Sequence, residues 1–140
     1  MDKTMNQQAN DLLVTFRAEA EERLTVITDT LRRLQTTPQP ELHFSLLGEV
    51  FGNIQSLRGA ASTVEQPDIE AITQSLEDIF ARLRHDDMRL ASDAYPIIEQ
   101  SLTTALNVVR SPTGRYSTSV SDAVEALMRL ADEGEEQGLV

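Results

Sequence analysis

The chain offers few side chains that could act as nucleophiles, general bases or metal ligands. Its 140 residues include two histidines, His43 and His85, and no cysteine. The absence of cysteine excludes disulfide scaffolds and zinc sites of the cysteine type. A hydrolase triad would need a histidine in a formed pocket, and the metal-ligand count is too low for a metal centre. We therefore expect no catalytic residue, no metal, no cofactor and no enzymatic activity.

A row of small residues is the more informative feature. Gly48, Gly52 and Gly59 fall within one segment of helical periodicity, although each glycine costs a helix interior about 1 kcal/mol relative to alanine. At about 100° per residue, these glycines share a narrow stripe with Gln55 and Ser62. The stripe lies beside the apolar seam of that helix and not on it, so another backbone could come close to it.

Two interpretations of this stripe remain open. The glycines could allow tight helix–helix packing inside a bundle, or they could form a docking face for a partner protein with Gln55 at its centre. A local cost without a local gain is where function is expected. Gln74 and Glu77 follow a similar spacing in the next helical segment, where Glu77 could reach a neighbour on the glycine-bearing helix.

The elements that must position these residues are helices. Apolar residues recur at steps of three and four almost everywhere, and no strand pattern competes. The periodicity predicts helices over about 8–35, 41–65 and 67–84, a fourth that begins near Ser92-Asp93 and runs to about Val109, and a shorter fifth that carries Val120 to Ala131. Prolines at 38, 40 and 67 mark the first two breaks, because proline removes a donor and suits the first position of a helix.

These segments predict an all-α fold, an antiparallel up-down four-helix bundle with an additional C-terminal fifth helix. We expect loops over 85–89 and 111–118, and a frayed acidic end over 132–138. A single bundle domain over 1–134 is predicted, followed by a flexible acidic tail or the start of a linker over 135–140.

Charge and hydropathy limit the possible partners. There are 23 acidic and 12 basic residues, for a net charge of −11, and the basic residues are scattered. Such a chain is repelled by phosphate backbones, so we expect no nucleic-acid binding. The apolar runs are far shorter than the roughly 20 residues that span a bilayer, and the first residues have no secretory signal pattern. We expect a cytoplasmic protein without membrane insertion.

The segment 54–62, Ile-Gln-Ser-Leu-Arg-Gly-Ala-Ala-Ser, resembles the central motif of histidine-phosphotransfer (HPt) domains. That motif reads roughly His-Ser-Leu-Lys-Gly-Ala-Ala, followed by a small residue. The resemblance covers most of the chain and is closest to the phosphotransfer domain of chemotaxis-type histidine kinases. It implies that the motif lies on the second helix of an antiparallel bundle.

The resemblance also implies roles for individual residues. Arg58 matches a family cation that assists the phosphoryl group, and Gly59 matches a small position that lets a response regulator approach. Glu77 matches a third-helix glutamate that hydrogen-bonds the phosphorylated imidazole. Gln74 lies one turn before it, where some members carry another polar residue or a histidine.

One departure from the family changes the expected chemistry. The phosphorylated histidine of the family would fall at position 55, where this chain has glutamine. Phosphotransfer needs a neutral, nucleophilic imidazole nitrogen. A primary amide offers hydrogen bonds of similar reach but no usable lone pair on nitrogen. Gln55 therefore matches the shape of the phosphoacceptor without its reactivity.

No other residue is an obvious substitute for the missing histidine. His43 precedes Gln55 by 12 positions, which turns it about 120° around the helix. His85 falls at the expected end of the third helix, where we expect a solvated C-terminal cap. Ser62 lies on the stripe, but a hydroxyl is a poor nucleophile without a base.

We therefore predict a non-phosphorylatable, pseudo-HPt interaction module in a two-component or chemotaxis-like pathway. Its partner would be a response-regulator receiver domain or a histidine kinase module, held by Gly48, Gly52, Gln55, Arg58, Gly59, Ser62, Gln74 and Glu77. Two alternatives remain open. One is an architectural N-terminal domain of a larger chemotaxis-type kinase or pilus-signalling protein. The other is an active phosphotransfer protein that uses Ser62 or a histidine. The oligomeric state is left open.

Overall fold

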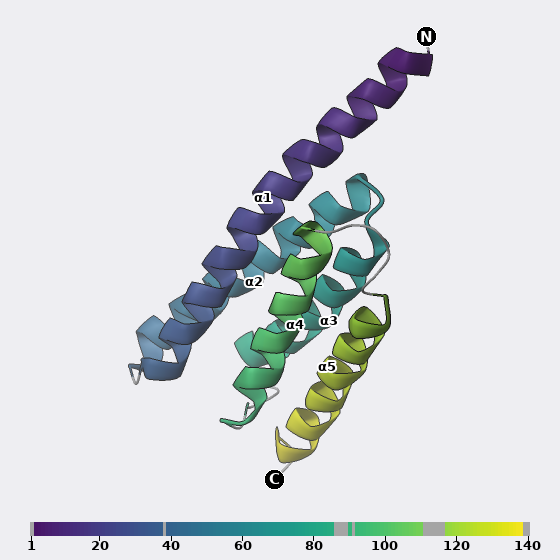
Figure 1. The fold of residues 1–140 in the computed structure, drawn as a ribbon. Coiled ribbons are helices and arrows are strands. Elements are labelled where there is room, and N and C mark those ends of the chain that lie inside the picture. Colours follow the sequence, from purple (N-terminus) through teal and green to yellow (C-terminus); the bar gives the residue numbers. More distant parts are fainter. Residues whose placement is uncertain (1, 38, 86–89, 91, 111–116, 139–140) are drawn as a thin grey trace.

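The described part of the chain is helical. The computed structural model describes residues 2–37, 39–85, 90, 92–110 and 117–138, and its helices appear in Figure 1. They are α1 (Asp2–Thr36), α2 (Pro40–Thr63), α3 (Pro67–Arg84), α4 (Ala94–Arg110) and α5 (Ser117–Gly138). Among these residues no strand is found, which confirms the predicted all-α class.

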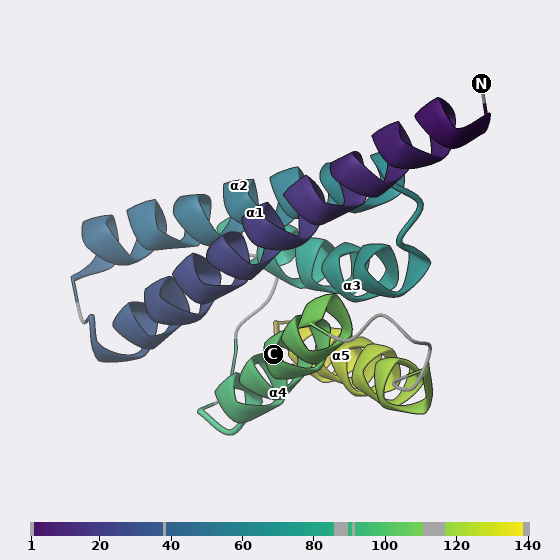
Figure 2. The same ribbon diagram turned by 45° about the horizontal axis from the view of Figure 1, so that its top comes forward.

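The helices alternate in direction along the bundle (Figure 1). α1 contacts α2 and α4, and α3 contacts α2 and α4, which closes the four-helix arrangement. α5 packs against α3 and α4, and Figure 2 shows it lying beside α4. The fifth helix therefore extends one side of the bundle, which confirms the predicted architecture.

The core follows the predicted apolar seams. In α1 the buried positions begin at Phe16 and recur to Leu34, and in α2 they run from Leu46 to Ala61. Leu13 and Val64, at the ends of two predicted seams, are only partly buried. The fully buried side chains of greatest volume belong to the first three helices: Phe80, Leu24, Ile27, Leu31, Leu46, Ile54, Leu57, Ile69, Ile72, Leu76 and Ile79.

Four hydroxyl side chains are buried in this apolar core, at Thr30, Thr73, Ser101 and Thr104. Each donates to a backbone carbonyl of its own helix about one turn earlier: Thr30 to Val26 at 2.8 Å, Thr73 to Ile69 at 2.8 Å, Ser101 to Ile98 at 2.7 Å and Thr104 to Gln100 at 3.0 Å. Since an unpaired buried hydroxyl is costly, these local bonds let the core contain polar residues without a wider network.

Several helix boundaries differ from the prediction. α1 begins at Asp2 instead of about 8, and α5 covers Ser117–Gly138 instead of about 120–131. Both extensions are polar segments, where helical hydrogen bonds continue without an apolar seam to signal them. The expected frayed end over 132–138 is therefore helical, as are positions 117–118 of the expected loop. Residues 86–89 and 111–116 of the expected loops lie outside the described residues, and the boundary at 134 remains a prediction.

The turn between α2 and α3 is tight because a Schellman motif ends α2. The Gln66 N–H donates to the Ala61 carbonyl at 2.8 Å, and the Glu65 N–H donates to the Ser62 carbonyl at 3.2 Å. Glu65 has a φ of 55°, the left-handed conformation that this motif requires and glycine favours. α3 then begins at Pro67, as predicted.

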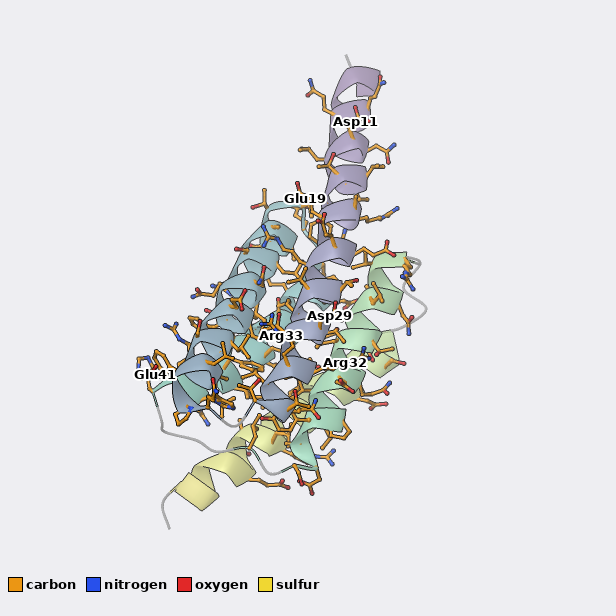
Figure 3. The ribbon with its side chains drawn as sticks, turned by 90° about the vertical axis from the view of Figure 1, so that its left-hand side faces the viewer. Asp11, Glu19, Asp29, Arg32, Arg33 and Glu41 are labelled. Carbon is orange, nitrogen blue, oxygen red and sulfur yellow. The ribbon has the colours of Figure 1, made fainter. Side chains whose placement is uncertain are left out.

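The N-terminal part of α1 projects beyond the other helices (Figure 1). Figure 3 shows charged side chains spaced along α1, including Asp11, Glu19 and Asp29, all of them exposed. Leu12 and Val14 on the projecting part are 61% and 56% exposed. Among the described residues, no helix is long and apolar enough to cross a membrane.

Candidate functional site

The candidate site lies on the surface of α2 beside α3. Ile54 and Leu57 are buried and fix the rotation of α2 about its axis. That rotation leaves Gly52, Gln55, Gly59 and Ser62 exposed, with Gly48 half-buried at one end of the row. The predicted stripe is therefore a surface beside the core.

The glycines of this stripe do not serve helix packing. A methyl group placed at Gly48, Gly52 or Gly59 would meet no neighbouring atom within 4 Å. A glycine that allows two helices to approach would have a neighbouring backbone or side chain in that space. The packing interpretation is therefore wrong for these three residues, and within the described chain their helix-propensity cost has no compensating contact.

Glu77 connects α3 to α2 at the centre of the stripe. Its carboxylate accepts hydrogen bonds from the Gln55 side-chain amide, Nε2 to Oε1 at 3.4 Å, and from Arg58 Nη2 to Oε1, also at 3.4 Å. Arg58 Nε also donates to Glu77 Oε2. These contacts confirm the expectation that Glu77 reaches a neighbour on the glycine-bearing helix. They form a charge-neutral cluster of an amide, a guanidinium and a carboxylate.

The cluster is only partly shielded from water. The Glu77 side chain is 19% exposed and that of Arg58 is 38% exposed. Because an ion pair at such a depth stabilises a protein by little, its main effect is to hold both side chains in one orientation beside Gln55. Arg58 and Glu77 were matched to separate family roles, and the sequence predicted a contact from Glu77 to α2 without identifying Arg58 as a partner. Their positions on neighbouring amphipathic helices, both beside the core, were the available signal.

The other predicted positions lie around this cluster or away from it. Gln74 is exposed one turn before Glu77, and Ser62 is exposed at the far end of the stripe. His85 is the C-cap of α3, as expected, with its N–H donating to the Ala81 carbonyl at 3.2 Å. His43 is half-buried near the start of α2, about 18 Å along the helix from Gln55. Both histidines of the chain are thus separate from the stripe.

A further contact braces the same stretch of α2 from α1. Arg23 Nη1 donates to the Asn53 side-chain oxygen at 3.1 Å, and the Asn53 amide donates to the Glu49 carbonyl at 2.9 Å. Neither residue was among the predicted site residues, since neither falls on an apolar seam or on the stripe. The contact links α1 to α2 at Asn53, two residues before Gln55.

The groups on this surface are hydrogen-bonding groups. An amide, an ion pair and exposed backbone at glycine offer hydrogen bonds and close approach, but no neutral nitrogen nucleophile. Among the described residues, no group of three or more histidine, cysteine, aspartate or glutamate side chains could hold a metal ion.

Comparison with known proteins gives the family. Residues 11–111 match the Hpt domain family, so the chain belongs to the Hpt domain family. The match includes α2 and α3 entirely, together with the whole stripe and Glu77. The family resemblance drawn from the segment 54–62 is therefore confirmed.

The relatives are chemotaxis proteins of much greater length. The chain is 25% identical over 119 residues to the chemotaxis protein CheA of Treponema pallidum and 26% identical over 102 residues to that of Bacillus subtilis. These alignments cover 84% and 73% of this chain but only 14% and 15% of the two relatives. The chain thus corresponds to a small part of such a protein.

A solved structure shares the fold. The phosphorylated P1 domain of CheA3, in complex with CheY6 from R. sphaeroides, superposes with a TM-score of 0.67 at 15% sequence identity. The match covers 86% of this chain and 98% of that domain. The helical bundle described above is therefore the fold of a CheA P1 domain.

Proposed function

We propose that this domain is a pseudo-HPt module, which docks a response-regulator receiver domain through the α2 and α3 surface without accepting a phosphoryl group. The observation that carries the proposal is the open space above Gly48, Gly52 and Gly59. The helix forgoes alanine at three positions where nothing within the domain requires glycine. A partner that comes close to the α2 backbone would supply the missing contact.

Two further observations support a receiver domain as that partner. The chain belongs to the Hpt domain family, and the structural relative is a P1 domain in complex with CheY6, a partner named for that protein. The exposed glycines and the Gln55–Glu77–Arg58 cluster lie together on one surface. A neutral surface with small residues places little steric or electrostatic obstacle before a rigid partner.

The lack of phosphotransfer is argued from chemistry. Gln55 stands at the phosphoacceptor position of the family motif, and its amide nitrogen cannot form a labile N–P bond. Neither histidine lies on the stripe, and Ser62 lies about 28 Å along α2 from His43, too far for it to act as a base. The alternative of an active phosphotransfer protein thus has no supporting geometry, and the domain would not be an enzyme.

The architectural alternative depends on the glycines serving internal packing, which the open space above them contradicts. A role inside a longer kinase remains compatible with docking, because the relatives in which this segment occurs are several times longer. A kinase module as the partner is therefore an outcome that the docking experiment can return.

The test is a titration of the domain with a CheY-type receiver domain, in which binding is measured by calorimetry and by changes in the NMR chemical shifts of backbone amides. We expect saturable binding with the largest shifts at Gly52, Gln55 and Gly59. Gly59→Arg should weaken binding at least tenfold, because the long side chain enters the close-approach surface. Ser121→Arg, an exposed position on α5, is the matched control and should bind like the unaltered domain. Equal affinity of the two variants would contradict the assignment of this face.

A further inference from the structure

A pocket lies at the end of the bundle where α2 begins, away from the Gln55 surface. This pocket of about 520 Å³ is lined by residues from the end of α1, the start of α2, the end of α3 and the start of α4. This volume falls in the range of about 300–1,000 Å³ that small-molecule sites occupy. Its α2 residues lie between Pro40 and Leu47, so the pocket is separate from the Gln55 surface.

The walls of the pocket are mainly apolar. Leu47 and Phe80 are buried and form part of the lining, while Phe44 is 57% exposed at its edge. Leu83 and Leu90 complete the apolar lining. An exposed phenylalanine beside an open apolar cavity costs solvation free energy that a bound apolar group would recover.

Three residues with polar side chains are part of the pocket lining: Arg84, His43 and Tyr95. The Arg84 guanidinium carbon lies 4.8 Å from the Phe51 ring centroid, and among the described residues no acceptor pairs with its buried Nε. A guanidinium with an unsatisfied donor is costly to bury. An anion in the pocket would give this guanidinium a charged partner.

The Tyr95 phenol remains a donor at neutral pH. Burial raises the pKa of Tyr95 above its ordinary value of 10.0, since the charged form is disfavoured away from water. The Tyr95 phenol O–H and a His43 imidazole N–H are thus further hydrogen-bond donors in the lining of the pocket.

The charge of the lining contrasts with that of the chain. The chain carries 23 acidic residues and a net charge of −11, yet among the described residues the lining of the pocket includes Arg84 and no aspartate or glutamate. An apolar pocket with one cation, in an otherwise acidic protein, selects a ligand with an apolar body and a single negative charge.

We propose that this pocket binds a small organic monocarboxylate with an apolar body. The carboxylate would accept hydrogen bonds from Arg84, with His43 and Tyr95 as further donors, and the apolar body would lie against Phe44, Leu47 and Phe80. Arginine and a carboxylate form the strong, charge-assisted type of hydrogen bond. This site does not depend on receiver docking or on the chemistry at Gln55.

Octanoate is a suitable probe, with octanamide as its uncharged match. In calorimetric titrations of the whole domain we expect saturable binding of octanoate and at least tenfold weaker binding of octanamide. Arg84→Gln should weaken octanoate binding at least tenfold. Arg129→Gln, on α5 and 74% exposed in its side chain, removes the same charge outside the pocket and should leave binding unchanged.

Phe44→Ser provides a second variant in case Arg84→Gln unfolds the domain. Because Phe44 is 57% exposed, its loss leaves the core intact but removes part of the apolar wall, so octanoate affinity should fall severalfold. Equal binding of octanoate and octanamide would overturn the proposal, as would unchanged affinity in both pocket variants. Absence of saturable binding at millimolar octanoate would overturn it too. Gly59→Arg should leave octanoate binding intact, which separates this site from the proposed docking face.

Discussion

At position 55 one side chain decides whether the site can react. Gln55 Nε2 donates to Glu77 Oε1 at 3.4 Å, and an imidazole N–H placed there has a similar reach. Glutamate that accepts one imidazole N–H leaves the other ring nitrogen as the nucleophile. We therefore predict that Gln55→His gains acid-labile phosphate when incubated with a CheA-type kinase core and ATP, whereas the unaltered domain gains none.

The unaltered domain contains His43 and His85 as well, so it is its own control for labelling at other histidines. The double variant Gln55→His with Glu77→Gln should be labelled more slowly, because Glu77→Gln removes the carboxylate that would accept the imidazole N–H and orient the ring. Labelling of the unaltered domain at the same rate as Gln55→His would show that the phosphoacceptor is elsewhere, which would contradict the pseudo-HPt proposal.

The helix α2 carries a cost that substitution can measure. Because a methyl group at Gly52 meets nothing within 4 Å, Gly52→Ala should stabilise the domain by about 1 kcal/mol through helix propensity alone. For a domain of this size that corresponds to a rise in melting temperature of about 2–5 °C. Thermal unfolding followed by circular dichroism measures the change. A lower melting temperature would mean that the position is packed after all.

The C-terminal cap of α2 holds a second local cost. Glu65 adopts a φ of 55°, a left-handed conformation that costs a residue with a Cβ about 1–2 kcal/mol. Glu65→Gly should raise the free energy of unfolding by about 0.5–1 kcal/mol, since the flexibility of glycine in the unfolded chain offsets part of the gain. Urea unfolding gives the value. Glu65→Ala removes the carboxylate but keeps the Cβ, so it should show no such gain.

A feature of the helices could be predicted only where it leaves a pattern in the sequence. Apolar periodicity located the helices and their buried faces, and the motif around Gln55 located the site. The polar start of α1 and both polar ends of α5 leave no periodic signal, so these boundaries were wrong. The Arg58–Glu77 pair and the pocket around Arg84 bring together residues from different helices. Such contacts depend on helix rotation and crossing, which a single sequence does not specify.

Across the whole molecule, α5 is the element whose contribution is least evident from the motif. It buries Val120, Leu127 and Leu130 against α3 and α4, and so supports the helix that positions Glu77 from the side opposite α2.

Leu127→Ala removes a side chain with 0% exposure and should lower the free energy of unfolding by about 2–5 kcal/mol. Met128→Ala, at the next position and 59% exposed, should change it by less than about 1 kcal/mol. Urea unfolding should be followed by circular dichroism and by tyrosine fluorescence in a Tyr116→Phe background, in which Tyr95 of α4 is the remaining tyrosine. If α5 belongs to one cooperative unit, the unfolding midpoints from both probes shift together in Leu127→Ala. Under conditions where the variant is fully folded, its affinity for the receiver domain should stay unchanged. Separate transitions would show that the four-helix core folds without α5.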